Sequence, residues 1–132
     1  MPSFVIPGRP YSKKRPRFAR ATGRAYDPAE NAKAEAAIGH IASRLFNGPI
    51  TGPVHVEIEA RFMPAASWSK KRRAEALGQS HAQKPDCDNI AKAVLDGLNR
   101  IAWADDAQVA AISIRKVWAE RDEVLVTVRG AE

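Results

Sequence analysis

The feature that most constrains the fold is segment 54–62, in which apolar and polar side chains alternate. The apolar positions are Val54, Val56, Ile58, Ala60 and Phe62. Successive side chains on a β-strand point to opposite sides of a sheet, so this pattern predicts a strand with one buried face. Such a strand has to bury its apolar face against a second layer of structure.

Three further segments have the composition of strands. Residues 3–6 form a short apolar run that Pro7-Gly8 closes, and residues 109–118 and 124–128 are apolar-rich segments joined around 120–122. β-Branched and aromatic residues bounded by turn residues are typical of strands. The chain therefore contains enough strands for a sheet.

Between these strands, apolar residues recur at helical spacing. Asp27-Pro28 opens a helix that continues to about Phe46, and Ser67 is expected to cap a short helix that ends at Leu77. A third helix is predicted over 88–99. Its apolar stripe is Ile90, Ala91, Val94, Leu95 and Leu98. The order β-α-β-α-α-β-β predicts an α/β (α+β) fold with a mixed β-sheet and packed helices.

Length and cysteine content narrow the class of protein. The chain has 132 residues, which suits one domain over residues 1–132, and no repeat or linker divides it. Cys87 is the single cysteine, so no intrachain disulfide can form. The first residues lack the apolar stretch of a secretory signal, and no apolar run is long enough to span a bilayer. We therefore expect a cytoplasmic protein without a membrane partner.

Basic residues are concentrated in two places, and the formal net charge is +6. A long loop at about 8–27 holds seven cations and no acid between positions 9 and 24. These are Arg9, Lys13, Lys14, Arg15, Arg17, Arg20 and Arg24. The second cluster is Lys70, Lys71, Arg72 and Arg73. Clustered cations of this kind indicate contacts with nucleic-acid phosphates, so we expect both clusters to bind DNA.

Each basic cluster also has a simpler interpretation. Tyr11, Phe18 and Tyr26 interleave with the cations of the loop, and an exposed ring could stack on a base at a DNA branch point. Alternatively, the loop is a solvated arm whose aromatic side chains pack on the core. The second cluster, 70–73, could equally be an exposed helix surface.

The acidic residues that carry chemistry lie around the third predicted helix. Asp86 and Asp88 are separated by one residue where the chain enters that helix, and Asp105-Asp106 follows it. Hydrolysis of a phosphodiester needs a hydroxide near neutral pH and positive charge at the phosphate. Mg²⁺ or Mn²⁺ held by a few carboxylates supplies both. We therefore expect these carboxylates, from two distant stretches of chain, to meet around one divalent cation.

Lys92 lies one helical turn after Asp88 and on the same side of the predicted helix. There it could neutralise the scissile phosphate or orient the attacking water. Asp96, one turn further on, is expected to pair with Lys92. These residues have structural interpretations too: Asp86 or Asp88 could be the helix N-cap, and Asp88–Lys92 an ordinary exposed ion pair. The 105–106 pair could be a solvated turn.

Several other residues are expected to have structural roles. The three histidines share no metal-ligand spacing, so positions in the core or on the surface are expected. Trp103 and Trp118 are predicted to pack next to the site. Glu57 and Glu59 lie on the face of their strand opposite the apolar one and are expected to face solvent.

Taken together, the motifs resemble the RusA-type Holliday junction resolvases, small endonucleases common in prophages. The resemblance covers almost the whole chain. The motifs that carry it are Gly8-Arg9-Pro10, Arg15-Pro16-Arg17, Asp86-Cys87-Asp88-Asn89, Lys92, residues 93–99 and Asp105-Asp106-Ala107-Gln108.

The resemblance implies a RusA-like fold and specific roles for these residues. The aspartates of the family fall on Asp86, Asp88 and Asp106 as catalytic metal ligands, with Asp105 as a further candidate ligand. The catalytic lysine falls on Lys92. The resemblance also implies Mg²⁺ as the cofactor, with Mn²⁺ expected to support activity, and no organic cofactor. It implies a homodimer that makes paired nicks across a four-way junction.

The leading hypothesis is therefore a metal-dependent endodeoxyribonuclease that resolves Holliday junctions and related branched DNA in recombination and repair. One alternative is a basic nucleic-acid-binding module without catalytic activity, in which the acids only cap helices and balance charge. A second is a less selective nuclease that acts on flaps or forks.

Overall fold

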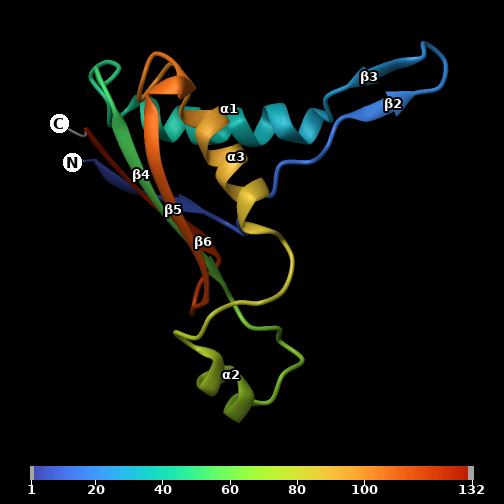
Figure 1. The fold of residues 1–132 in the computed structure, drawn as a ribbon. Helices are drawn as coiled ribbons and strands as arrows, with labels where there is room; N and C mark the ends of the chain where they lie inside the picture. Colours follow the sequence, from blue (N-terminus) through green and yellow to red (C-terminus); the bar gives the residue numbers. More distant parts are fainter. Residues whose placement is uncertain (1, 131–132) are drawn as a thin grey trace.

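The computed structural model describes residues 2–130, which form a β-sheet with helices on one side (Figure 1). The elements in chain order are β1 (Ser3–Pro7), β2 (Arg17–Ala19), β3 (Arg24–Tyr26), α1 (Ala29–Ser43), β4 (Val54–Phe62), α2 (Lys70–Ala76), α3 (Cys87–Leu98), the 3-10 turn η1 (Asp106–Gln108), β5 (Val109–Trp118) and β6 (Glu123–Gly130). The predicted α+β fold is confirmed.

The main sheet has the strand order β1-β6-β4-β5. β4 runs parallel to β5 and antiparallel to β6, so the sheet is mixed, as predicted. Although β6 follows β5 in the chain, it lies on the other side of β4 and pairs with β1. Parallel neighbours need a crossover connection, which α2 and α3 provide between β4 and β5. β5 is consequently one edge of the sheet.

Helices α1 and α3 cover one face of this sheet, and the core lies between the two layers (Figure 1). Val56 and Val126 from the sheet and Leu98 from α3 are all fully buried there. The two helices pack very closely, because a Cβ added at Gly97 would lie 2.7 Å from the Cβ of Ile38. Only glycine permits this approach. This packing holds the C-terminal part of α3 against α1.

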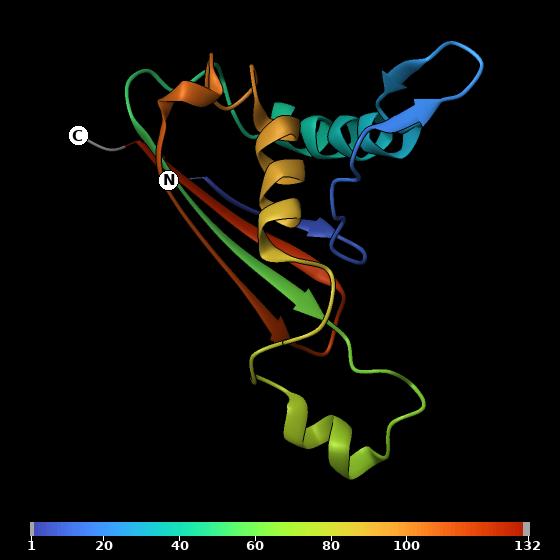
Figure 2. The ribbon, with the colours of Figure 1, turned by 45° about the vertical axis from the view of Figure 1, so that its right-hand side comes forward.

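Residues 8–27, predicted to be an irregular loop, contain a β-hairpin. β2 and β3 pair antiparallel, with Arg17 opposite Tyr26. The hairpin projects beyond α1 and away from the main sheet (Figure 2), and Phe18 on it is 67% exposed. Strands of three residues are too short to show a recognisable alternation, so periodicity did not predict them.

A second projection, residues 63–86, carries α2 beyond the other end of the sheet (Figures 1 and 2). The N-cap of α2 is Ser69, whose side chain accepts a hydrogen bond from Arg72 N, so the predicted cap at Ser67 was wrong by two residues. No residue of α2 is buried. Aromatic contacts hold this region to the sheet, including Trp68 against Trp118 with 5.0 Å between ring centroids.

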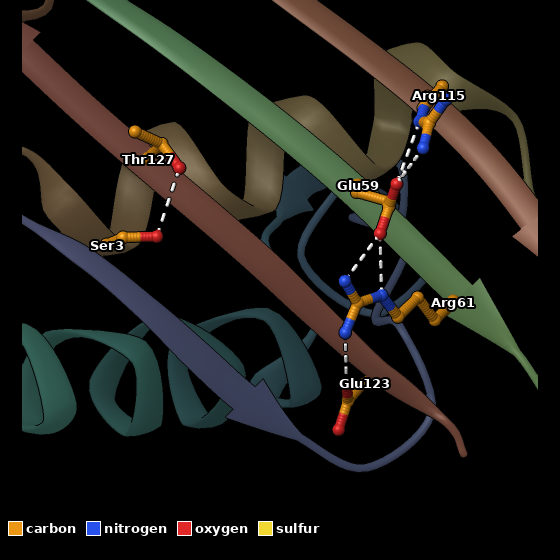
Figure 3. A network of polar contacts seen from close by, with 6 residues as sticks. All are labelled: Ser3, Glu59, Arg61, Arg115, Glu123 and Thr127. Carbon is orange, nitrogen blue, oxygen red and sulfur yellow. Dashed lines mark hydrogen bonds and ion pairs between the residues drawn. The ribbon is translucent and has the colours of Figure 1, made fainter. Parts of the chain in front are cut away.

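The sheet face opposite the helices carries a network of ion pairs (Figure 3). Arg61 Nε donates to Glu59 Oε2 at 2.6 Å and Arg61 Nη1 donates to Glu123 at 2.6 Å, while Arg115 also pairs with Glu59. The pKa of Glu59 is lowered, mainly because Arg115 donates a hydrogen bond to its carboxylate. Glu59 lies on the open face of the sheet, as predicted, but its two arginine partners leave only 18% of its side chain exposed.

Other boundaries agree well with the sequence. The strands predicted at 54–62 and 109–118 are confirmed at both ends. Pro28, rather than Asp27, is the N-cap of α1, and the Asp27 carboxylate accepts a hydrogen bond from Asn31 instead. Among residues 2–130, no helix combines the length and apolar character needed to cross a membrane.

Candidate active site

The start of α3 holds two exposed aspartates. Asp86 is the N-cap residue, in an extended conformation, and its side chain makes no capping hydrogen bond. Asp88 lies in the first turn, and its Oδ1 accepts a hydrogen bond from Asn89 N at 2.9 Å. A helix N-terminus carries partial positive charge, which stabilises carboxylates placed there. Asp86 therefore has the position of an N-cap while its carboxylate stays available to a ligand.

An open groove runs beside Asp86. The charged and amide side chains in its lining are Arg9, Lys14, Lys84, Asp86 and Asn89. The cations come from the segment before β2 and from the loop before α3, so the fold brings together two stretches that are distant in sequence. A DNA backbone lying in this groove would meet cations along its length and the carboxylate at its margin.

Lys92 is exposed on α3, one turn after Asp88. The predicted pairing of Lys92 with Asp96 is wrong, because Asp96 pairs with Lys13 from the segment before β2. Lys13 also lies 3.7 Å from Glu35. Among the described residues, Lys92 has no carboxylate within ion-pair distance. Its ammonium group is therefore available to a bound phosphate.

Asp105 and Asp106 lie in the turn η1, immediately before β5. Asp105 caps the turn: its Oδ1 accepts from Ala107 N at 3.0 Å, and Gln108 Oε1 accepts from Asp105 N at 3.1 Å. Asp106 Oδ1 accepts a hydrogen bond from Trp103 Nε1 at 2.8 Å. Trp103 is fully buried, which confirms its predicted packing role. The two neighbouring aspartates thus have different partners, and the core orients Asp106.

Asp86 and Asp88 lie at the N-terminal end of α3, whereas Asp105 and Asp106 lie at η1, beyond the C-terminal end of the helix. Figure 2 shows η1 and the start of α3 at opposite ends of the helix. The helix has 12 residues and is therefore about 18 Å long. Within residues 2–130, no three His, Cys, Asp or Glu side chains lie close enough to hold one metal ion. A single protomer does not bring Asp86 and Asp88 together with Asp106. Their meeting around one cation stays a prediction.

The seven cations of the 9–24 segment have unequal surroundings. Lys13 forms an ion pair with Asp96, and the guanidinium of Arg9 lies 5.4 Å from the ring centroid of Phe62. Glu30 pairs with two more of these cations, Lys14 at 3.3 Å and Arg17 at 3.6 Å. The remaining three are exposed and have no ion-pair partner among the described residues. These are Arg15, Arg20 and Arg24.

Sequence analysis missed a buried asparagine that anchors this segment to α1. Asn31 is 0% exposed. Its Oδ1 accepts from Tyr11 Oη at 2.6 Å and from Lys14 N at 2.9 Å, and its Nδ2 donates to Lys14 O and to Asp27 Oδ1, both at 2.9 Å. Asn31 lies two turns before Ile38 on the same face of α1. A polar residue at that core-facing position was the signal that could have identified it.

The cluster 70–73 lies on α2, where three of its four cations are exposed. The guanidinium of Arg72 lies 3.7 Å from the ring centroid of Trp68, which is a cation–π contact. Such stacking limits the motion of that side chain but leaves its charge accessible. The role of this cluster in DNA binding stays a prediction.

Lys116 on β5 is a second residue that sequence analysis missed. Its Nζ donates to Pro85 O at 2.7 Å and to Gln83 O, and Pro85 immediately precedes Asp86. Lys116 shares the helix-facing side of β5 with Ile112, Ile114 and Trp118. A cation in a row of apolar residues was the available signal in the sequence.

The donors at the start of α3 suit a hard divalent cation. Mg²⁺ prefers oxygen ligands and is often held by one or two carboxylates, with water and substrate phosphates completing its coordination. Asp86 and Asp88 are exposed and provide carboxylate oxygens of this kind. Cys87 between them is half-buried, and a thiol is a poor ligand for Mg²⁺. The residues therefore fit Mg²⁺ in their chemistry, although one protomer places only two of the predicted ligands together.

Comparison with known proteins identifies the family. The family described as "Endodeoxyribonuclease RusA" matches residues 7–129. The chain is also 33% identical over 135 residues to the "Uncharacterized protein YqaN" of Bacillus subtilis (strain 168), a match that covers 96% of this chain and 94% of that protein. The YqaN description names no activity. Because the family match spans nearly the whole chain, this protein belongs to the RusA endodeoxyribonuclease family.

Proposed function

We propose that this protein is a metal-dependent endodeoxyribonuclease that resolves four-way junctions and related branched DNA in recombination and repair. Membership of the RusA endodeoxyribonuclease family supports DNA cleavage. The observation that carries the proposal is the pair of exposed aspartates at the start of α3, beside a groove lined by Arg9, Lys14 and Lys84. In this arrangement the cations can hold the DNA backbone while the carboxylates hold a divalent cation beside it.

In the proposed reaction, Asp86, Asp88 and Asp106 would hold Mg²⁺ or Mn²⁺. Such an ion would supply positive charge at the scissile phosphate and would lower the pKa of a water molecule, so that hydroxide is available near neutral pH. Lys92 extends from α3 one turn after Asp88, where its ammonium group stabilises the charge that develops on the phosphate. No covalent intermediate with the protein is needed.

The exposed cations supply the binding surface. Arg20 and Arg24 lie on the β2–β3 hairpin and Arg15 lies just before it, and their charges meet backbone phosphates without reading sequence. Phe18 is exposed on the same hairpin and offers a ring that can stack on an unpaired base at the branch point. Lys70–Arg73 on α2 form a second cationic surface, at the other projection of the molecule.

The position of the acids supports a homodimer. Asp86 lies at the N-terminal end of α3, which is about 18 Å long, and Asp106 lies in η1 beyond the other end of the helix. Two chains related by a twofold axis can instead place Asp106 of one copy beside Asp86 and Asp88 of the other. Two such composite sites in one dimer would account for paired nicks.

The exposed edge of β5 is the surface we propose for this dimer. The last residues of β5 pair with the chain before α3, as in the bridge between Ser80 and Val117, whereas residues 110–113 are exposed. Ile112 in this stretch is 42% exposed. An exposed and uncharged stretch at the edge of a sheet tends to pair with another strand.

The register of such pairing matches the position of the acids. If two β5 strands pair antiparallel about a twofold axis at Ile112, Ala110 of one copy lies opposite Ile114 of the other. The chain before α3 already pairs with β5 from Lys116 onward, so the pairing between copies ends there, with Gln108 of one copy aligned with Lys116 of the other. Gln108 follows Asp106 closely, and Lys116 contacts Pro85, the residue before Asp86. The same edge pairing therefore directs the two halves of the proposed site toward each other.

A labelled synthetic four-way junction tests the proposed function. Incubation of the junction with the protein and Mg²⁺ or Mn²⁺ should give symmetrical paired nicks, and EDTA should abolish them. Linear duplex and flap substrates of the same sequence measure the selectivity. Equal cleavage of all three substrates would instead indicate a less selective nuclease.

The binding module without catalytic activity remains a second candidate, favoured by one observation: in the described part of a protomer no three metal-binding side chains meet. Junction binding without cleavage under every metal condition would establish this function and contradict the nuclease proposal.

A further inference from the structure

Lys116 connects the edge strand of the sheet to the segment that carries Asp86. Its backbone carbonyl accepts a hydrogen bond from His81 N at 3.0 Å. Its ammonium group donates to Pro85 O at 2.7 Å and also to Gln83 O. One residue of β5 therefore fixes three successive points of the chain between His81 and Pro85.

This stretch of chain has few other attachments. It joins α2, which has no buried residue, to α3, whose stripe is buried in the core. His81 anchors its start: the imidazole is 5% exposed and stacks on Phe62 with 4.1 Å between ring centroids. Asn89 anchors the other end, because its carbonyl accepts from Lys13 N at 2.9 Å. Between these anchors, Lys116 donates to the backbone carbonyls of Gln83 and Pro85, and His81 Nδ1 accepts a long hydrogen bond from Gln83 N at 3.4 Å.

A long side chain that ends in a cation suits the contact of Lys116 with the carbonyls of Gln83 and Pro85. The carbonyls of Gln83 and Pro85 converge on one point, and an ammonium group has three donors that can serve both of them. Hydrogen bonds from a charged donor are stronger than neutral ones, so the contact restrains the backbone effectively. The partial burial of Lys116 beneath the segment limits competition from water.

We propose that Lys116 is a positioning residue for the metal site: by holding the backbone at Gln83 and Pro85, it sets where the carboxylate of Asp86 lies. The inference rests on the proposed function, in which Asp86 is a metal ligand. Lys116 itself contacts neither the metal nor the DNA. Its effect passes through one peptide unit, from the Pro85 carbonyl to Asp86.

The test compares Lys116→Met with Lys116→Arg in the full-length protein. Methionine keeps the unbranched apolar stem and loses the donors, whereas arginine keeps the charge and donors. Lys33→Met is the matched control, because Lys33 is an exposed lysine on α1 outside the site and the basic clusters. Amide hydrogen exchange in metal-free protein is measured for peptides that cover residues 82–89. Mn²⁺ binding is titrated by electron paramagnetic resonance, and junction cleavage is measured across Mg²⁺ concentrations.

We expect Lys116→Met to increase exchange at 82–89 at least tenfold, to weaken Mn²⁺ binding several-fold and to raise the Mg²⁺ concentration needed for half-maximal cleavage. Junction binding without metal should change less than twofold, and Lys116→Arg should recover most of the loss. Lys33→Met should match the wild type throughout. Unchanged exchange and Mn²⁺ binding in Lys116→Met would overturn the positioning role, even in a protein that cleaves junctions. A wild-type protein that shows no cleavage would instead overturn the proposed function. The exchange and Mn²⁺ measurements would still test whether Lys116 positions Asp86.

Discussion

The indole of Trp103 donates a hydrogen bond to the carboxylate of Asp106, with 2.8 Å between Nε1 and Oδ1. Trp103 is completely buried among core residues of the sheet and of α3. The direction of the Asp106 side chain is therefore set by the hydrophobic core rather than by the surface turn that contains it. A carboxylate has two oxygens that accept, so this bond leaves capacity for a cation.

Replacing Trp103 tests whether this orientation matters. Trp103→Phe keeps a large ring but removes the donor, so we expect a several-fold higher Mg²⁺ requirement for junction cleavage. The free energy of unfolding should fall by about 1–3 kcal/mol, because the smaller ring leaves a cavity and Asp106 loses its partner. Urea unfolding and cleavage assays across Mg²⁺ concentrations measure both effects.

Val128→Ala, a truncation of a fully buried residue on β6, is the control for lost stability alone. It should be destabilised while it keeps the wild-type Mg²⁺ requirement. If Trp103→Phe behaved in the same way, the orientation of Asp106 would not contribute to the site.

Mixing two inactive variants tests the composite site. Asp86→Asn and Asp106→Asn should each abolish cleavage, because each removes a ligand from both sites of the dimer. In a mixed dimer, one site carries both substitutions and the other carries neither. We therefore expect nicking to return when the two variants are unfolded and refolded together, as measured on a labelled junction.

Each variant refolded alone is the control and should stay inactive. Circular dichroism should show unchanged helix content in both variants, because the substituted side chains are not part of the core. Mixed samples that form dimers and yet stay inactive would contradict a site shared between chains.

A charge on the edge of β5 should disrupt the dimer. Ile112→Lys puts two ammonium groups face to face across the proposed twofold axis, so we expect a monomer in sedimentation analysis and a loss of cleavage of at least tenfold. Leu45→Lys is the matched control, since Leu45 is also an exposed apolar residue, 46% exposed just beyond α1. A stable, active Ile112→Lys dimer would show that the interface lies elsewhere.

The cations of the 9–24 segment should separate into two classes. Arg15→Ala combined with Arg20→Ala should weaken junction binding and lower the slope of log K against log salt by about 2, one for each lost phosphate contact. Their stability should stay within about 0.5 kcal/mol of the wild type, because both are exposed. Fluorescence anisotropy at several salt concentrations measures the slope.

Lys13→Ala should show the opposite pattern. Its hydrogen bond with Asp96 raises the pKa of Lys13 and ties the segment to α3. Loss of this half-buried contact should cost about 1–2 kcal/mol of unfolding free energy and change the salt slope little. A reduced salt slope without lost stability would mean that Lys13 binds DNA directly.

Stability should depend on pH through His81. Burial, followed by the nearby charges of Lys116 and Arg9, lowers the pKa of His81. The unfolded histidine binds a proton below about pH 6.5 while the folded one stays neutral, so stability falls as pH decreases below that value. The free energy of unfolding falls by at most about 1.4 kcal/mol for each pH unit. It stops falling once the pH is below the pKa of His81 in the folded protein.

His81→Phe preserves a ring between Phe62 and Trp118. In this variant, the free energy of unfolding should lose the part of its pH dependence between pH 7.5 and 5.5 that His81 contributes. Burial also raises the pKa of Glu35, which makes the folded protein more stable as pH decreases. This effect is the same in the wild type and in His81→Phe, so it cancels when their unfolding free energies are subtracted. Identical pH profiles of unfolding free energy would show that His81 does not titrate differently in the folded state.

Local patterns in the sequence were sufficient for the main elements and for the motif of the site. The alternation at 54–62 and the apolar stripe of 90–98 reflect burial of one face, which repeats every two or about 3.6 residues and can be read without knowing the partner. Asp86, Asp88 and Lys92 lie within one short stretch, so their relation to each other follows from helix geometry alone.

Tertiary structure alone decided which distant groups meet. The insertion of β6 between β1 and β4, the pairing of Lys13 with Asp96 and the contact of Lys116 with Pro85 all join residues far apart in the chain. Such contacts depend on the packing of whole layers, and no local periodicity records them. For the same reason, the sequence placed the acids at 86–88 and 105–106 on either side of a predicted helix but did not decide whether the fold brings them together. Whether those carboxylates share a cation depends on how two folded chains associate.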